Sequence, residues 1–247
     1  GPYLVSENLM YDSLRVKNLV PSTEPYSASP FNKPQIGAPG GETVSAQVLA
    51  TSGNNAIVDW IFLEIRDAIN PSMIIATKRA LLQRDGDVVS AADGSSPVFF
   101  TGLAPGSYYL SVKHRNHLGV MSANAIPVSA CSTSDYDFTT TSQVYTNPYI
   151  AFPPRKQVGS RYVLWPGDAN NNKNIRYNGL SNDKDYIMAA IGGAAMLNNT
   201  VFDVYRMEDV NMDGKIRYNA TDNDRSVILN NVGVNTPNNI LYQHVPN

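Results

Sequence analysis

Apolar residues recur at strand-like spacing through the first half of the chain. The segment 56–67 (AIVDWIFLEIRD) places Ile57, Trp60 and Phe62 among charged residues over the length of one strand, and the segment 44–51 alternates apolar and polar positions with period two. Further runs cover residues 73–82, 98–103, 108–114 and 125–129, with turn signals at Asp85-Gly86, Asp93-Gly94 and Pro105-Gly106. We predict a strand for each run and a β-sandwich over residues 43–135.

Other segments show different patterns. Residues 1–42 contain five prolines between positions 21 and 39, which favour an extended N-terminal arm. The run LAPGSYYLSV at 103–112 joins a Pro-Gly turn to a Tyr-rich strand, a pattern typical of immunoglobulin-like sandwiches. Residues 136–161 are rich in Ser, Thr, Tyr and Pro and lose the alternation, so we predict a linker there. The predicted fold class is mainly β, an immunoglobulin-like β-sandwich followed by a separate C-terminal region, 162–247.

The C-terminal region contains an internal duplication. Residues 168–192 (DANNNKNIRYNGLSNDKDYIMAAIG) recur 41 positions later as residues 209–233 (DVNMDGKIRYNATDNDRSVILNNVG), without a gap. Each copy then has an i, i+4 apolar pair, Ile187 with Ile191 and Ile228 with Val232, followed by a glycine suited to a helix end. We predict two loop–short helix units that pack their apolar faces into one small core.

The second copy has the residue types of a calcium loop. Side-chain oxygens at loop positions 1, 3 and 5 turn towards one centre, and glycine at position 6 permits the sharp bend. Asp209, Asn211, Asp213 and Gly214 satisfy this template. The residue after the glycine offers its backbone carbonyl, which is that of Lys215 here.

The last ligand departs from the standard loop. Position 12, where a carboxylate is usual, is Ala220, and the nearest recurrent acid is Asp224, 15 residues after Asp209. We therefore predict that Asp224 completes the ligand set and that a bulge forms between Tyr218 and Asn223.

The first copy is a weaker version of the same loop. Its corresponding residues are Asp168, Asn170, Asn172, Asn174 and Asp183. Asn172 replaces an acid and Lys173 replaces the glycine, so the loop has less negative charge and a lysine where a positive φ is needed. The alternative for both copies is an Asx-rich turn held by its own side chains.

Two resemblances follow from these residues. The Asp-x-Asn-x-Asp-Gly spacing in region 167–233 resembles the duplicated loops of dockerin modules, the calcium-dependent docking domains of extracellular enzyme complexes. The late ligand and the spacing depart from that family, so the resemblance does not imply cohesin binding. It implies a dockerin-like pair of calcium loop–short helix units.

The second resemblance covers nearly the whole chain. The strings VDWIFLEIRDA, ALLQRDGDVV, SPVFF, GSYYLSVKHRNHLGVMSA and DVNMDGKIRYN are similar to a module that recurs in large secreted surface proteins of Bacteroidota, described as haemagglutinin-like. Such proteins are commonly exported by the type IX system through a separate C-terminal sorting domain. The resemblance implies a secreted or cell-surface location and supplies no catalytic residue.

Composition and charge narrow the functional class. The formal net charge of -2 and the pI near 5.9 provide no positive excess for neutralising phosphates, so we predict no nucleic-acid partner. No apolar run approaches the roughly 18 residues of a membrane span, so we expect no membrane-spanning segment. The single cysteine, Cys131, excludes an internal disulfide, and stability must come from packing or from metal.

Two other groups of residues could form a zinc site or a catalytic site, but their patterns are less specific than the calcium loops. His114 and His117 have the His-x-x-His spacing of a zinc site, but a polar network that fixes the loop after a strand explains them more simply. Asp59, Glu64, Arg66 and Asp67 are similarly explained as strand-edge ion pairs. The chain has no G-x-S-x-G, P-loop or Rossmann fingerprint, and we predict that it is not an enzyme.

We therefore expect a non-enzymatic, extracellular structural or adhesive module that Ca2+ stabilises. Its partners would be other surface proteins or copies of itself, bound through the arm or an unpaired strand edge. The alternative is a carbohydrate-binding module of a secreted polysaccharide-active protein, with Trp60, Trp165 and some of the 14 tyrosines stacked on a glycan. Exposed coplanar aromatic rings would favour the alternative, and buried rings would favour the scaffold.

Overall fold

A computed structural model describes residues 2–129, 133–140 and 143–246 of the chain. Cys131 lies outside the described residues, as do small parts of the predicted arm, sandwich, linker and C-terminal region. The predicted mainly β class is confirmed, because several antiparallel sheets dominate the described residues. No helix among them is long and apolar enough to cross a membrane.

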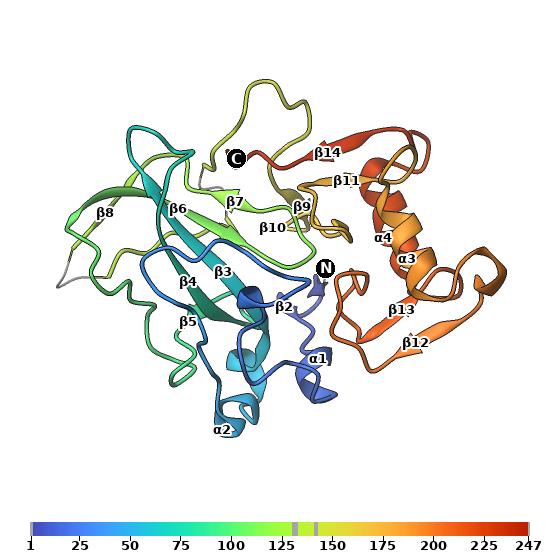
Figure 1. The fold of residues 1–247 in the computed structure, drawn as a ribbon, viewed down its shortest axis with the longest axis horizontal. Coiled ribbons are helices and arrows are strands. Elements are labelled where there is room, and N and C mark those ends of the chain that lie inside the picture. Colours follow the sequence, from blue (N-terminus) through green and yellow to red (C-terminus); the bar gives the residue numbers. More distant parts are fainter. Residues whose placement is uncertain (1, 130–132, 141–142, 247) are drawn as a thin grey trace.

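Six strands of the described residues form an antiparallel sheet on one side of the molecule (Figure 1). The strand order is β5-β4-β3-β6-β7, and β8 pairs with β6 beyond the end of β7. The bounds are Ile57–Asp67 for β3, Ile74–Gln83 for β4, Val88–Val89 for β5, Gly106–Lys113 for β6, Val120–Met121 for β7 and Ile126–Val128 for β8. The long strand β3 lies between β4 and β6, with Trp60 opposite Leu81 and Glu64 opposite Ser111.

Four of the predicted strand runs correspond to β3, β4, β6 and β8, and two are wrong. In the run 44–51, the hydroxyl of Ser45 accepts a hydrogen bond from the backbone N–H of Val48 (3.2 Å) and caps the helix α2, Ala46–Leu49. In the run 98–103, Val98 and Phe100 pack against a core cluster without forming a ladder. Of the alternating apolar residues in 44–51, Val44 and Val48 are buried whereas Ala46 and Ala50 are exposed, so the pattern determined neither the burial nor the backbone hydrogen bonds.

Both faces of β3 are covered, which explains why its first ten residues are all buried. Trp60 and Phe62 belong to a core shared with the N-terminal segment, whereas Ile61 and Leu63 belong to a smaller cluster that includes Val98 as a partly buried member. Alternate residues of a strand point to opposite faces, so the two clusters lie on opposite sides of the sheet.

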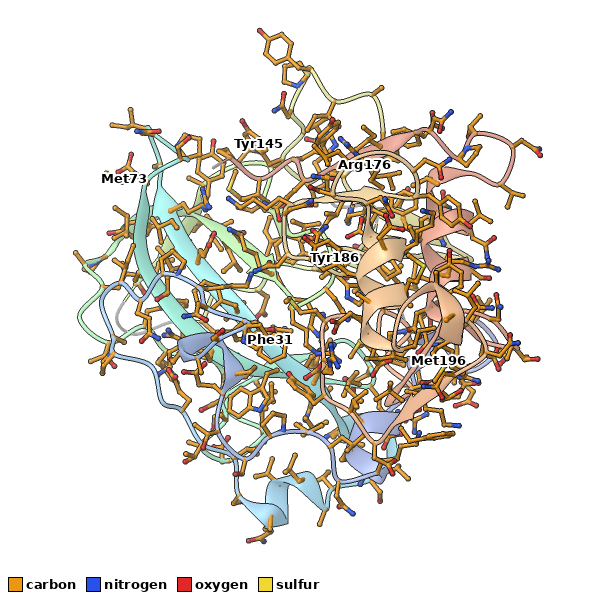
Figure 2. The ribbon with its side chains drawn as sticks, turned by 45° about the vertical axis from the view of Figure 1, so that its right-hand side comes forward. Phe31, Met73, Tyr145, Arg176, Tyr186 and Met196 are labelled. Carbon is orange, nitrogen blue, oxygen red and sulfur yellow. The ribbon has the colours of Figure 1, made fainter. Side chains whose placement is uncertain are left out.

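The N-terminal segment is irregular for most of its length but packed against the rest of the chain. It contains β1 (Tyr3–Leu4), β2 (Leu9–Met10), the helix α1 (Ser13–Val16) and a 3-10 turn at Pro25–Ser27, and a second such turn, Gly53–Asn55, precedes β3. Leu14 and Tyr26 are fully buried, and the carbonyl of Ile36 accepts from the N–H of Thr77 on the outer side of β4 (2.8 Å). In Figure 2, Phe31 of this segment lies over the sheet, whereas Tyr186 belongs to the helix α3 (Asp183–Ala190).

The two C-terminal repeats are interlocked. The elements are β9 (Lys156–Val158), β10 (Arg161–Val163), β11 (Asn174–Arg176), α3 (Asp183–Ala190), a 3-10 turn (Ala194–Met196), β12 (Thr200–Phe202), β13 (Lys215–Arg217), α4 (Asp224–Val232) and β14 (Ile240–Tyr242). The strand before each helix pairs with the strand after the other helix, β11 with β14 and β13 with β12. Neither repeat therefore completes its own sheet.

The predicted apolar pairs form the core between the repeats. Ile187, Ile191, Ile228 and Val232 are at most 1% exposed and belong to one cluster, and α3 packs against α4 (Figure 1). Each helix begins at an asparagine cap whose amide oxygen accepts a backbone N–H, and each is followed by a glycine with positive φ, Gly192 or Gly233. This part of the prediction is confirmed.

Candidate metal centre

The second loop has its position 1, 3 and 5 side chains wrapped around one turn. The carboxylate of Asp209 accepts the backbone N–H groups of Asp213 (3.0 Å) and Gly214 (2.9 Å). The side-chain oxygen of Asn211 also accepts from Asp213 N (3.0 Å), and the carboxylate of Asp213 accepts from Lys215 N (2.9 Å). Gly214 has φ of 76° and makes the bend that the sequence predicts.

Asp224 returns to the start of this loop. Its carboxylate accepts the backbone N–H of Val210 (2.9 Å) and that of Arg217 (2.9 Å), and the side chain is fully buried. The intervening residues 218–223 form a turn in which Ala220 and Asp222 have positive φ. The extra residues of the loop therefore form this turn, and the role of Asp224 as the last ligand stays a prediction.

The first loop has the same main-chain path. The carboxylate of Asp168 accepts from Asn172 N (2.9 Å) and Lys173 N (3.0 Å), and Asp183 accepts from Ala169 N (2.8 Å) and Arg176 N (2.7 Å). Lys173 has φ of 67°, close to that of its counterpart Gly214. The repeat thus holds a lysine in a conformation that L-residues with side chains rarely adopt.

Each loop holds a buried pair of acids. Burial raises the pKa of Asp168 to about 6 and that of Asp183 to about 8, and the charge of Asp168 adds to the increase at Asp183. In the second loop, burial raises the pKa of Asp209 to about 7, and burial and the charge of Asp209 raise the pKa of Asp224 well above its ordinary value. None of the ion pairs formed by the described residues includes any of these acids.

The donor set is oxygen only and fits a hard cation. No group of three His, Cys, Asp or Glu residues that could hold a metal gathers within the described part of the chain, so Asp209, Asp213 and Asp224 do not form such a cluster, and each loop would rely on its one buried acid pair together with amide and backbone oxygens. Calcium accepts such mixed oxygen ligands. Asp209, Asn211, Asp213 and Asp224 would hold the ion in the second loop, where Asp213 also forms an ion pair with Arg217.

The first loop offers a weaker set, which consists of Asp168, Asn170, Asn172 and Asp183. The carbonyl ligands expected from Lys215 and Asn174 stay predictions. The backbone hydrogen bonds described above also occur in Asx turns, so the metal interpretation depends on the buried acid pairs, which an Asx turn does not need.

One asparagine connects both loops to the sheet. The side-chain amide of Asn116 donates to the carbonyls of Met207 (3.0 Å) and Asp209 (2.7 Å), and its backbone carbonyl accepts the N–H of Asp168 (3.1 Å). Asn116 is fully buried after the end of β6. It therefore contacts the position 1 residue of each loop, a role that sequence reasoning missed because no local pattern marks it.

The neighbours of Asn116 form a buried polar network around Asp59. The carboxylate of Asp59 contacts His114 Nε2 (2.9 Å), Arg115 Nε (3.2 Å) and the hydroxyl of Tyr205 (2.7 Å). His117 contacts His114 through their Nδ1 atoms (3.0 Å), and burial lowers the pKa of both rings. This arrangement supports the polar network over the zinc site, since the described residues supply no third metal ligand of the usual kinds.

The remaining acids of β3 also have structural partners. Glu64 contacts Arg66 (2.8 Å) and Lys113 (2.7 Å), and Asp67 accepts the N–H groups of the following turn. The Glu64 and Arg66 pair lies on a central strand and is buried, so it is not the strand-edge pair that the sequence suggested.

The N-terminal segment reaches both loops. Lys17 Nζ donates to the carbonyl of Asp213, and a Cβ added to Gly214 would lie 2.6 Å from a methyl carbon of Leu19. Lys33 Nζ donates to the side-chain oxygen of Asn171 in the first loop (3.3 Å).

Comparisons of the chain with protein-family models, with curated proteins and with solved structures find no match.

Proposed function

We propose that the chain is a non-enzymatic structural or adhesive module of a secreted, cell-surface protein, stabilised by Ca2+ in its C-terminal repeats. In this proposal the repeats are a dockerin-like pair, and the antiparallel sheet with its covering segments is an immunoglobulin-like sandwich. The sequence resemblance to secreted surface proteins of Bacteroidota supports the location. The buried acid pairs of the two loops support the proposal that the repeats bind calcium.

The observation that carries the proposal is that two buried acid pairs, which take part in none of the ion pairs of the described residues, are fastened to the sheet through Asn116. A dication in each loop would offset the repulsion between the paired carboxylates. Because Asn116 contacts the first residue of each loop, ordering the loops also fixes the repeats against the sheet. Calcium binding would in this way add to the folding free energy of the whole chain.

The first test is calcium titration by calorimetry together with thermal melts. We expect saturable binding and, at about one hundred times the dissociation constant, about 2.7 kcal/mol of added stability, or roughly 5–10 °C in the melting temperature. The variant Asp209→Asn, Asp213→Asn should lose the binding of the second loop. The matched control is Asp203→Asn, Asp222→Asn, which removes the same charge at two exposed residues with positive φ.

The outcomes separate the alternatives. Binding that persists in the control and is reduced in the loop variant supports a calcium site in the second loop. If the unmodified chain binds no calcium in the millimolar range, the loops are Asx turns and the calcium part of the proposal is wrong. Circular dichroism in chelator shows whether the loop variant is folded before its binding is compared.

The aromatic side chains give less support to the sugar-binding alternative. Trp60 is fully buried, and its indole N–H donates to the carbonyl of Pro21 (2.8 Å). Trp165 is half-buried, with Lys156 Nζ 5.7 Å from the centre of its ring. Trp60 therefore cannot stack on a glycan, and its burial favours the scaffold.

The partners in our proposal are other surface proteins or further copies of the chain. The route through a free arm is less favourable than the sequence suggested, since the N-terminal segment packs on its own sheet and covers part of the outer side of β4. Contact between copies would instead use exposed apolar residues such as Ile69 and Tyr149, each 94% exposed.

Sedimentation velocity over a range of concentrations tests self-assembly. With calcium present, we expect a concentration-dependent increase in the sedimentation coefficient, which the variant Ile69→Ser, Tyr149→Ser should reduce, because burying exposed apolar area drives association. The variant Val5→Ser, Val16→Ser, at two other exposed apolar residues, is the control. A chain that stays monomeric at the highest concentration contradicts self-assembly and leaves other surface proteins as the partners.

A further inference from the structure

A cavity of about 230 Å3 lies where the N-terminal segment, the sheet and the first loop meet. We call it the junction cavity. Lys33 of the N-terminal segment, Arg66 of β3, Lys113 of β6 and Lys173 of the first loop line it, together with the acids Glu64 and Asp168. Its volume is below the about 300–1,000 Å3 of pockets for drug-sized ligands, so it suits a smaller group.

The charges that line the cavity do not balance. Its four cations exceed its two acids, and the two histidines that also line it are held neutral by burial. Glu64 is already shared between Arg66 (2.8 Å) and Lys113 (2.7 Å). The carboxylate of Asp168 accepts two backbone N–H groups of its own loop. Glu64 is therefore held by the two cations of the sheet, whereas the charge of Asp168 still acts on Lys33.

Lys33 is the cavity cation of the N-terminal segment, and the charges of Asp168 and Glu64 act on it without a direct ion pair. None of the ion pairs among the described residues includes it. Its Nζ has neutral neighbours, the side-chain oxygen of Asn171 (3.3 Å) and the ring of Tyr26 (5.8 Å to the centre). Burial, and next the charge of Lys113, lower the pKa of Lys33 to about 8. A half-buried ammonium beside a second ammonium is stabilised when an anion approaches both.

We propose that the junction cavity binds an oxyanion group, a carboxylate or a phosphate on a small ligand, with the Lys33 ammonium as its ion-pair partner. Lys113 and Arg66, which share one carboxylate, supply further positive charge on the sheet side. Charge-assisted hydrogen bonds from ammonium groups to carboxylate or phosphate oxygens are among the stronger polar contacts in proteins. Because Asp168 of the first loop also lines the cavity, the site is tested in chelator, so that calcium does not change the charge of that loop.

The experiment is a titration of the full chain, in chelator and at low ionic strength, with sodium phosphate and separately with sodium acetate. Sodium chloride of equal ionic strength is the blank. We expect saturable binding by calorimetry, with amide NMR shifts concentrated at Lys33, Lys113 and Asn171. The anion that binds more tightly identifies the oxyanion type.

Three variants locate the contact. Lys33→Gln should weaken binding about tenfold or more, and Lys33→Arg, which keeps the charge, should retain most of it. Lys184→Gln, on the surface of α3 and outside the cavity, is the control for the lost charge. Binding that is not saturable with either anion, or equal affinity for Lys33→Gln and the control, overturns the proposal. If Lys33→Gln does not fold, the NMR shifts of the unmodified chain still show whether the anion binds at the junction cavity.

Discussion

Replacing Asp59 with asparagine is expected to destabilise the chain by about 3–5 kcal/mol, because it removes the ion-pair partner of the buried guanidinium of Arg115. Both side chains are at most 1% exposed, and Asp59 also contacts His114 and Tyr205. The new amide would turn N–H groups towards donors that now face a carboxylate. Since folded domains are stable by only about 5–15 kcal/mol, a loss of this size is easily measured by denaturant unfolding.

The control lies on the same strand. Asp67→Asn removes the same charge at the end of β3, where asparagine can still accept the turn N–H groups of Ile69 and Asn70, so its effect should stay within about 0.5 kcal/mol. Arg115→Met in the Asp59→Asn background should restore part of the stability, since it removes the uncompensated charge. Equal unfolding free energies for the two asparagine variants would contradict this account of Asp59.

The polar network around Asp59 also connects the sheet to the second loop through hydrogen bonds. Asp59 lies on β3, and its partners Arg115 and Tyr205 lie after β6 and between the two repeats. Arg115 Nη1 donates to the carbonyl of Arg206 (2.8 Å), and the adjacent Asn116 donates to that of Asp209. One short segment after β6 thus joins the central strand to the second loop. Loss of Asp59 should therefore loosen both the sheet and the repeats together.

Local features of the sequence predicted the parts of the fold that local chemistry determines. The 41-residue offset, the apolar pair at Ile228 and Val232, and the glycine at 214 predicted the repeats, because helix caps, apolar spacing and left-handed turns depend on near neighbours. The strand β3 was predicted for the same reason. The helix at Ala46–Leu49 was missed because a single cap at Ser45 outweighed the alternation.

The rest depends on contacts between distant residues. Nothing near Asn116 in the sequence shows that it meets the loop residue Asp209, 93 positions away. Lys33 is likewise 138 positions from its partner Asn171. The prolines of the N-terminal segment indicated irregular chain correctly, but they gave no information on which surface the segment covers. Buried polar contacts of this kind are satisfied by the tertiary fold and have no periodic signature.

The raised pKa values of the loop acids predict that the unfolding free energy depends on pH in opposite directions with and without calcium. The pKa of Asp209 is raised to about 7 and that of Asp183 to about 8, so the folded chain without metal holds protons that the unfolded chain has released. The stability that these protons provide is lost as pH rises through the folded pKa values. In chelator we expect the loop acids to lower the unfolding free energy progressively from about pH 4, the ordinary carboxyl pKa, to about pH 8, with roughly 1–2 kcal/mol of the loss between pH 7 and pH 8.

Calcium should reverse this trend because protons compete with it for the same carboxylates, so its affinity rises as the acids ionise. The stabilisation by calcium, measured as the difference from chelator at each pH, is expected to be small near pH 5 and largest near pH 8. Taking the difference cancels the opposite contribution of the buried histidines, whose lowered pKa values favour folding as pH rises to about 6.5. The variant Asp209→Asn, Asp213→Asn should flatten the dependence, whereas Asp203→Asn, Asp222→Asn should keep it. A calcium effect that is independent of pH would show that the ion binds outside the buried acid pairs.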